Sequence, residues 1–523
     1  MKDLAIECSP SQSTKVSTRD SATLDVNKRE DVQKLKPHAV GLLGVLFMAM
    51  AGSAPLTAML GNVPFAVGSG NGSAAPGGFI FAGVIIVLFS VGYVTMVRRF
   101  TTAGGFYTFI SHGLGRVFGM GAGWAGMGAY AIFEASLMGI FAFYARNTFA
   151  TFFGVHWAWP IFAFAAIILI GALTYFDVRL SARVLGILTA CEVVLLVLMD
   201  IFVFAKGGGP SGISAAPLNP IQSFSGANIA VAAPGVGIFF AFWSWVGFES
   251  SANYAEESKN PKRTVSWAVY ILAAGLCIFY TWTAWAVILG HGLSQSVKAA
   301  ATNPVTFFYS VTAHFVSPVA KDAMEWLIMT SSFACGMAFH NAATRYFYSM
   351  GREQVLHRQL GRTHHRWQSP HIGSLFQSAI AAVLVGLFLL LWFTNGATEK
   401  FATFQNAPYD ELYAWLAILG TFWIMVLMIG SSLGTVSYFA RHRSEESVLR
   451  WLVAPVLGAA GMIYAVYLLW VNVATLGGNI VFVKAIPYIG VGWLLVGFAI
   501  ALVIRRRNPK KYETLGRLVN EGV

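Results

Sequence analysis

The chain has 523 residues, of which 56% are hydrophobic and 11% charged, and its net charge is +12. Soluble domains carry about 25% charged residues, so this composition excludes a soluble globular protein and indicates a polytopic membrane protein. The basic residues flank apolar segments, where anionic lipid headgroups account for them, so membrane lipid is a predicted partner and nucleic acid is not.

Residues 1–36 are polar and lack the short apolar core of a cleaved signal, which predicts a disordered cytoplasmic tail. Twelve apolar runs near the membrane-spanning length of roughly 20 residues follow this tail. They cover residues 39–68, 79–97, 117–148, 159–175, 184–205, 229–250, 265–289, 323–350, 372–393, 412–440, 451–473 and 486–504.

The distribution of basic residues predicts the orientation of these spans. With the N-terminus inside, all but six of the 35 Lys and Arg residues fall on the inner side. The six exceptions are Arg146, Lys206, Lys298, Lys321, Lys400 and Lys484. Cytoplasmic loops of membrane proteins carry this excess, so we expect a plasma (inner) membrane protein with both termini in the cytoplasm.

Two of the predicted spans contain helix breakers. The first carries Gly52, Ser53 and Pro55 at its centre, and the sixth carries Gly247 after Phe242-Trp-Ser-Trp-Val. Irregular backbone at membrane depth is tolerated where it lines a protein-walled cavity. Breaks five spans apart are typical of an inverted repeat with a shared mid-membrane site. The alternative is that these residues only make kinks or close helix crossings.

The chain resembles the amino acid, polyamine and organocation (APC) permeases. The resemblance rests on the first-span break, on residues 103–116 with Gly123 and Trp124, on residues 242–263, and on Asn341 with residues 345–352. It implies an all-α fold of twelve transmembrane helices, a leucine-transporter-like 5+5 inverted repeat plus two C-terminal helices. The expected transport core is 37–440, with repeats at about 37–205 and 229–440, followed by helices 11 and 12 in 441–505 and a cytoplasmic tail at 506–523.

The resemblance also implies a substrate site at the two breaks. Backbone N–H groups of Gly52, Ser53 and Ala54 would bind a carboxylate at the positive end of a half-helix. Carbonyls of Met50, Ala51, Phe242 and Trp243 would bind an ammonium group. Trp243 resembles the family's aromatic gate and Phe242 and Trp245 lie beside it, although buried aromatic packing is the alternative. Pro55 departs from the family pattern because it has no N–H.

Carboxylates inside apolar runs are costly and mark functional positions. Glu249 stands where related exchangers carry a proton-sensing glutamate, and Glu192 is the second candidate for proton coupling. Glu134 is expected to face the substrate cavity or to pair with a neighbour. A buried structural carboxylate bonded to freed backbone groups is the alternative for Glu249.

Ser331 and Ser332 fall where sodium-coupled relatives supply hydroxyl ligands, so a sodium site is an alternative to proton coupling. Hydroxyls in membrane helices also bond their own preceding carbonyls. The four cysteines and the cluster of His357, His364, His365 and His371 lack metal-ligand spacing. No cofactor and no resident metal are predicted.

These observations predict a secondary active transporter that moves an amino acid or related amine by alternating access, coupled to protons. A sodium symporter, an amino acid or amine exchanger, and a substrate sensor without flux are the alternatives. Motifs of zinc enzymes, serine hydrolases and phosphate-binding loops are absent from the sequence, so no enzyme is predicted and no catalytic residue is assigned. The oligomeric state does not follow from the sequence.

Overall fold

The computed structural model describes residues 40–516, except 101–103, 176–177, 231, 256–257, 368, 396–402, 443–445 and 474–479. The predicted tail 1–36 therefore lies outside the described residues, as does the end of the C-terminal tail. The described part is helical, and its extended pairing is limited to two isolated bridges, Val40 with Ser258 and Gly72 with Ala227.

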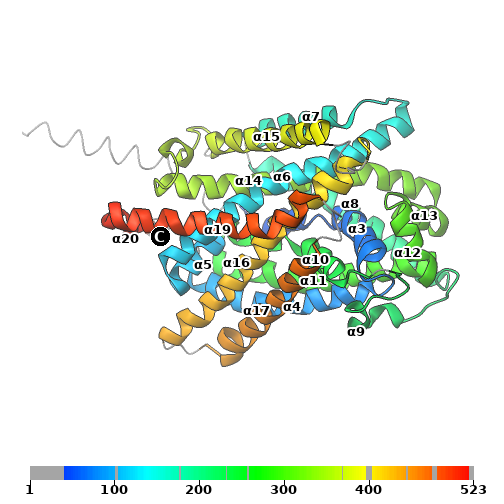
Figure 1. The fold of residues 1–523 in the computed structure, drawn as a ribbon, viewed down its shortest axis with the longest axis horizontal. Coiled ribbons are helices and arrows are strands. Elements are labelled where there is room, and N and C mark those ends of the chain that lie inside the picture. Colours follow the sequence, from blue (N-terminus) through cyan, green and yellow to red (C-terminus); the bar gives the residue numbers. More distant parts are fainter. Residues whose placement is uncertain are drawn as a thin grey trace, which may run out of the picture.

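Helices of different length and type follow one another along the chain (Figure 1). They are α2 Leu42–Ser53, α3 Pro55–Phe65, η2 Ala66–Gly70, α4 Ala75–Arg99, α5 Gly105–Leu114, α6 Arg116–Phe153, α7 Trp159–Tyr175, α8 Val178–Ala205, η3 Ala216–Leu218, α9 Pro220–Ser223, α10 Pro234–Trp245, η4 Phe248–Tyr254, α11 Pro261–His291, α12 Leu293–Thr302, α13 Thr306–Phe315, α14 Pro318–Arg352, η5 Arg358–Gly361, α15 His371–Asn395, η6 Pro408–Tyr413, α16 Ala414–Arg441, η7 Leu449–Val453, α17 Ala454–Asn472, α19 Val481–Arg507 and α20 Pro509–Thr514.

In the described part of the chain, nine helical segments are long and apolar enough to cross a membrane. The other three predicted spans correspond to α7 with 17 residues, to the interrupted pair α10 and η4, and to the more polar α14. The all-α polytopic fold is thus confirmed, while the count of twelve spans and the two repeat boundaries stay predictions.

Burial separates central helices from peripheral ones. In the most apolar 18 residues of α6, 89% are buried inside the protein, against 28% in α15 and in α19. A helix that is apolar all round and still buried belongs to the core, whereas exposed apolar faces suit lipid contact. Figure 1 shows α20 at one end of the elongated bundle and α12 and α13 at the other.

The C-terminal segment packs against the end of α14. The N–H of Gly516 donates to Glu353 Oε1 at 2.9 Å, and the hydroxyl of Tyr107 on α5 donates to Glu353 Oε2. Leu515 is buried, and Lys511 Nζ donates to the carbonyl of Gln354 at 2.7 Å. Burial raises the pKa of Glu353 to about 7 against the weaker opposing effect of these hydrogen bonds.

This contact predicts a pH-dependent stability. The pKa of Glu353 is higher in the folded protein than the value of about 4.3 expected for the unfolded chain. Between these two pH values, Glu353 therefore binds a proton more strongly in the folded protein than in the unfolded chain. The free energy of unfolding should therefore fall as the pH rises from about 4.5 to about 7, by on the order of 2 kcal/mol. Thermal unfolding of wild type and Glu353→Gln at pH 5 to 8 checks this.

We expect the stability advantage of Glu353→Gln over wild type to grow with pH, whereas the exposed control Glu513→Gln should follow wild type. An advantage that is constant across this range would contradict the prediction.

Candidate functional site

The first predicted break is present in the structure. Helix α2 ends at Ser53, and Ala54 has the left-handed conformation with φ 36° and ψ 77°. Pro55 begins α3, since proline fits the first helical turn and disfavours helical geometry in the residue before it. An alanine in this conformation costs roughly 1–2 kcal/mol, so the surrounding packing holds the break in place.

The second break lies against the first. Helix α10 ends at Trp245, and Gly247 has φ 116°, a conformation that residues with a Cβ rarely adopt. A Cβ on Gly247 would lie 2.4 Å from the carbonyl carbon of Gly52. The two breaks are therefore in backbone contact, and glycine is required at position 247 for both reasons.

A small cavity lies beside this contact, which we name the central cavity. Its volume is about 20 Å³, enough for roughly one water molecule. Its lining consists of Gly52, Ser53, Ala54, Thr57, Ala58, Asn62, Leu137, Trp243, Val246, Cys335, Phe339 and Tyr413. The conformation is thus closed around the site, and a substrate requires the lining side chains to move apart.

A chain of hydrogen bonds covers one side of the central cavity. Trp243 Nε1 donates to the Tyr413 hydroxyl at 2.9 Å, and this hydroxyl donates to Asn62 Oδ1 at 2.6 Å. The Asn62 amide in turn donates to Ser244 Oγ at 2.9 Å. The Trp243 ring stacks on Phe133 with centroids 4.5 Å apart. These bonds join α10, η6 and α3, so Trp243 is part of the closure of the cavity.

The backbone donors at the first break are already engaged. The N–H of Ala54 donates to Met50 O at 2.8 Å, and the N–H of Ala58 donates to Ala54 O at 2.8 Å. The N–H of Thr57 donates to Ser331 Oγ at 3.3 Å. Ala54 therefore does not offer the unpaired donor that was expected for a carboxylate, and the carbonyl of Met50 already accepts one hydrogen bond.

Two further carbonyls lie at the first break beside those that were predicted. Cys335 Sγ donates to the carbonyl of Gly52 at 3.0 Å, and the Tyr280 hydroxyl donates to that of Ser53 at 3.1 Å. Backbone carbonyls have two lone pairs, so each can accept a further hydrogen bond. Carbonyl oxygens that can accept a further hydrogen bond are thus present beside the central cavity.

Glu249 lies at the second break and is 1% exposed. Its Oε2 accepts from the N–H of Gly247 at 2.9 Å, and its Oε1 accepts from the Tyr130 hydroxyl of α6 at 2.8 Å. Tyr93 of α4 donates to its main-chain carbonyl at 3.1 Å. The carboxylate therefore connects the break to α6, and no Lys or Arg pairs with it among the described residues.

Glu192 occupies the corresponding position at the first break. Its Oε2 accepts from Ser331 Oγ at 2.7 Å, and Thr57 Oγ1 donates to the same Ser331 oxygen at 2.8 Å. The Leu56 N–H approaches this carboxylate, at the positive end of α3. Glu192 Oε1 lacks a hydrogen-bond partner of normal geometry in the described structure. At each break, a carboxylate of the chain thus lies against a backbone N–H group, Gly247 for Glu249 and Leu56 for Glu192.

Other residues that the sequence singled out lie elsewhere. Glu134 Oε2 bonds to His340 Nδ1 at 2.9 Å and to Gln377 Nε2 at 2.7 Å, in a fully buried network between α6, α14 and α15. Ser332 donates to Ile328 O of its own helix at 2.8 Å. Met50, Ala51, Phe242, Trp245 and Glu134 are not among the residues lining the central cavity.

Sequence reasoning missed several lining residues. Thr57 and Asn62 are polar residues inside the first apolar run, and this signal could have identified them. Tyr413, Phe339 and Leu137 carry no such signal, because aromatic and aliphatic residues are common throughout the spans. Their place at the cavity follows only from how distant helices pack.

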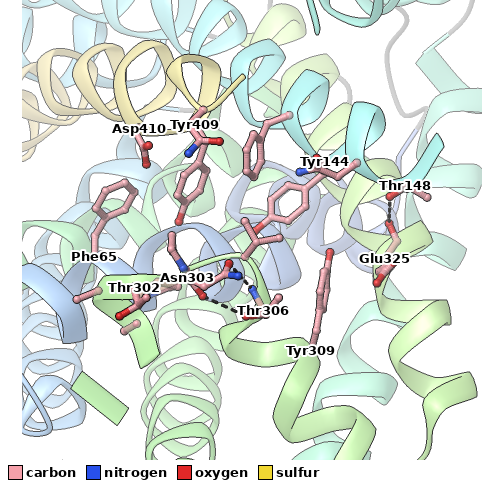
Figure 2. Close-up of a pocket in the computed structure, with 18 of the residues that line it drawn as sticks. Phe65, Tyr144, Thr148, Thr302, Asn303, Thr306, Tyr309, Glu325, Tyr409 and Asp410 are labelled. Carbon is pink, nitrogen blue, oxygen red and sulfur yellow. Dashed lines mark hydrogen bonds between the residues drawn. The ribbon is translucent and has the colours of Figure 1, made fainter. Parts of the chain in front are cut away.

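A second, larger cavity, which we name the vestibule, has a volume of about 740 Å³. It is lined by Phe65, Tyr144, Tyr309, Tyr409, Glu325, Asp410 and further residues of α6, α12 and α13 (Figure 2). Tyr409 lines the vestibule and Tyr413 lines the central cavity, and their rings stack with centroids 6.0 Å apart. These two tyrosines of η6 separate the cavities.

The contact between the breaks gives a testable prediction. Gly247→Ala should lower the free energy of unfolding by about 1–3 kcal/mol, because the added Cβ overlaps the Gly52 backbone. Gly275→Ala on α11 is the matched control, since a Cβ there has open space around it. Thermal unfolding in detergent measures both. Equal midpoints for the two variants would contradict the backbone contact.

Comparison with known proteins agrees with this architecture. A family model described as "Amino acid permease" matches residues 40–510. The chain is 24% identical over 477 residues to the low-affinity putrescine importer PlaP of Escherichia coli, covering 90% of this chain and 94% of the relative. It is 25% identical over 465 residues to the branched-chain amino acid permease BcaP of Lactococcus lactis subsp. cremoris, covering 84% and 89%.

Among solved structures, the Eremococcus coleocola manganese transporter is similar with a TM-score of 0.54 and 11% identity, covering 88% of this chain and 95% of that one. At this identity the match concerns the fold alone, and it agrees with the leucine-transporter-like architecture expected from the sequence. The resemblance to APC permeases is confirmed. The chain belongs to the amino acid permease family, as a multi-pass membrane transporter and not an enzyme.

Proposed function

We propose that this permease carries a substrate bearing an ammonium group and couples its movement to protons at Glu249 and Glu192. The observation that carries the proposal is that a buried carboxylate of the chain closes each of the two helix breaks. Intramembrane acids of this kind mark proton and substrate pathways in transporters. The relatives, a putrescine importer and a branched-chain amino acid permease, support amines or amino acids as the substrate class.

Glu249 is the first proton site in this proposal. Its carboxylate bonds to Gly247 at the break and to Tyr130 on α6, two parts that must separate when the site changes its exposure. Proton uptake removes the charge that these two donors stabilise, and so weakens the connection between them. Protonation would thereby favour the movement of the break relative to α6.

Glu192 is the second proton site. Its Oε1 oxygen has no conventional partner, so a proton can be accommodated there without breaking the hydrogen bond from Ser331. The group also lies at the N-terminal end of α3, where a negative charge interacts favourably with the helix. Loss of that charge makes the half-helix end available to another anion.

The acceptors beside the central cavity favour an ammonium group over a carboxylate. The carbonyls of Gly52 and Ser53 each accept one hydrogen bond and keep a second lone pair, whereas an N–H group has a single proton and the donors at the start of α3 are engaged within the protein. A zwitterionic amino acid is the second candidate. Its carboxylate would reach α3 only after Glu192 becomes neutral, which would couple amino acid binding to protonation at this residue.

Transport in this proposal requires the closed central cavity to open alternately toward each side. The predicted orientation makes the vestibule extracellular, since α12 and α13, which contribute to its lining, lie at the end of the bundle opposite α20. Opening toward the vestibule would break the hydrogen bonds between Trp243, Tyr413 and Asn62. Rocking of the first, second, sixth and seventh spans against the third, fourth, eighth and ninth would exchange the exposure.

Uptake of labelled putrescine and leucine into proteoliposomes tests the coupling. In Glu249→Gln we expect the stimulation of uptake by an inward proton gradient to fall by about tenfold, which corresponds to ~1.4 kcal/mol. Exchange of substrate without a gradient should persist. Asp200→Asn is the control, because Asp200 is a buried acid bonded to Thr283 and lines neither cavity. Undiminished gradient stimulation in both Glu249→Gln and Glu192→Gln would refute proton coupling.

A thermal-shift series tests the substrate class. Putrescine and butylamine should raise the unfolding midpoint more than leucine, because the Glu192 carboxylate occupies the position that the leucine carboxylate would take. In Glu192→Gln the response to leucine should increase relative to that of the amines. A parallel series with sodium in place of potassium examines the sodium alternative at Ser331. Ligand binding without any counterflow would identify a sensor instead of a transporter.

A further inference from the structure

We infer that the vestibule is a second ligand site, which binds an organic ammonium ion at Asp410 before the ion reaches the central cavity. The passage to the central cavity rests on the proposed function, whereas the binding of a cation at Asp410 does not. The two cavities are distinct, since no residue lines both of them.

The charges of the vestibule favour a cation. Its described lining includes two carboxylates, Glu325 and Asp410, and no Lys, Arg or His. Glu325 Oε1 pairs with Lys321 Nζ at 2.9 Å. Within the described structure, the half-buried Asp410 carboxylate forms no such pair. Asp410 therefore carries the uncompensated negative charge of a cavity whose protein walls strengthen its field.

An unsatisfied hydroxyl also points to a ligand. Tyr309 of α13 is only 6% exposed, and its hydroxyl has no hydrogen-bond partner in the described part of the chain. Figure 2 shows this hydroxyl directed into the cavity, on the side of Tyr144. Buried polar groups are normally bonded, so a ligand N–H group or a water would satisfy this oxygen.

Aromatic rings complete the surroundings of Asp410. Phe65 and Tyr409 stack with centroids 5.2 Å apart, and Phe143 stacks on the same Tyr409 at 5.2 Å. Figure 2 shows Asp410 beside Tyr409, with Glu325 on the opposite side of the cavity. Phe65 also stacks on Phe240, so these rings cover one another's faces and form an apolar wall on which the methylene groups of an organic ammonium ion can pack. Carboxylate and rings together suit an alkylammonium better than a strongly hydrated metal ion.

The position of this site connects it to the central cavity. Asp410 follows Tyr409 directly, and both belong to the π-helical turn η6, an irregularity common at functional sites. The Tyr409 hydroxyl donates to the carbonyl of Gly61 at 3.0 Å, and Tyr413 lies one turn further on. A cation at Asp410 would therefore lie beside Tyr409, one of the two tyrosines that must part for it to proceed.

The cavity is large enough for such a ligand. Its 740 Å³ falls within the roughly 300–1,000 Å³ of ordinary small-molecule sites. The central cavity, at 20 Å³, excludes any alkylammonium ion unless it opens. Tetraethylammonium, which is bulky and has no N–H group, is thus a probe for the vestibule.

Two measurements with tetraethylammonium test the site. In proteoliposomes it should inhibit uptake of labelled putrescine, and the half-inhibitory concentration should rise by about tenfold in Asp410→Asn, a loss of ~1.4 kcal/mol. In detergent it should raise the unfolding midpoint of wild type but not of Asp410→Asn. Asp322→Asn is the matched control, since Asp322 is an acid near the same end that does not line the vestibule.

Tyr309→Phe separates hydrogen bonding from charge. This variant keeps the ring and removes the hydroxyl, so the KM for putrescine should rise by about threefold, the effect of one hydrogen bond of ~0.7 kcal/mol. Inhibition by tetraethylammonium, which has no N–H to donate, should stay unchanged. An equal weakening of putrescine and tetraethylammonium binding in Tyr309→Phe would indicate a changed cavity shape and would count against the site.

The outcomes distinguish this inference from the proposed function. If putrescine is taken up, and tetraethylammonium inhibits wild type and Asp410→Asn equally, the vestibule site is overturned and the permease proposal stays intact. Absence of amine uptake together with a tetraethylammonium shift that Asp410→Asn abolishes would support the site and reject the proposed substrate. If Mg²⁺ raises the unfolding midpoint of wild type but not of Asp410→Asn, and tetraethylammonium has no effect, the site binds inorganic cations and the inference is overturned.

Discussion

The backbone contact between Gly52 and Gly247 is the constraint on which the centre of this protein depends. It holds two interrupted helices against each other at a distance that a single Cβ would prevent. Interrupted backbone inside a membrane is stable only where its polar groups find partners. Here the partners come from three other helices, through Tyr280 of α11, Cys335 and Ser331 of α14, and Tyr93 of α4. The packing around the contact therefore stabilises the geometry of the whole site.

The chain's own carboxylates complete this arrangement. Glu192 and Glu249 lie where helix ends offer donors, positions at which an external anion would otherwise bind. Because each carboxylate joins a break to a different helix, its charge state affects both local hydrogen bonding and the relative placement of the helices. The same feature links the proposed proton coupling to the proposed preference for an ammonium group, since one acid both binds the proton and excludes a substrate carboxylate.

The two cavities would serve different steps, with ligand entry at the vestibule and substrate recognition at the central cavity. The vestibule lies toward the end of the bundle where α12 and α13 are found and carries the negative charge of Asp410, while the central cavity is closed by Trp243, Tyr413 and Asn62. Tyr409 and Tyr413 form the partition between them. A cation would thus meet an acidic, aromatic chamber before it reaches the breaks. This order of sites follows from one irregular turn, η6, which contributes residues to both cavities.

The sequence by itself determined the membrane class, the helical fold and the positions of the breaks, because these depend on local properties. An apolar run gives a buried or lipid-facing helix wherever it lies, as residues 159–175 do in α7, and Pro55 and Gly247 interrupt a helix through their own backbone chemistry. Only the tertiary structure decided which side chains meet at the site. Tyr413 bonds Asn62 across 351 positions of the chain, and Glu134 turns to His340 and not to the cavity. The periodicity of one helix fixes its apolar face but not the partner that covers this face, so these contacts arise only when the helices pack together.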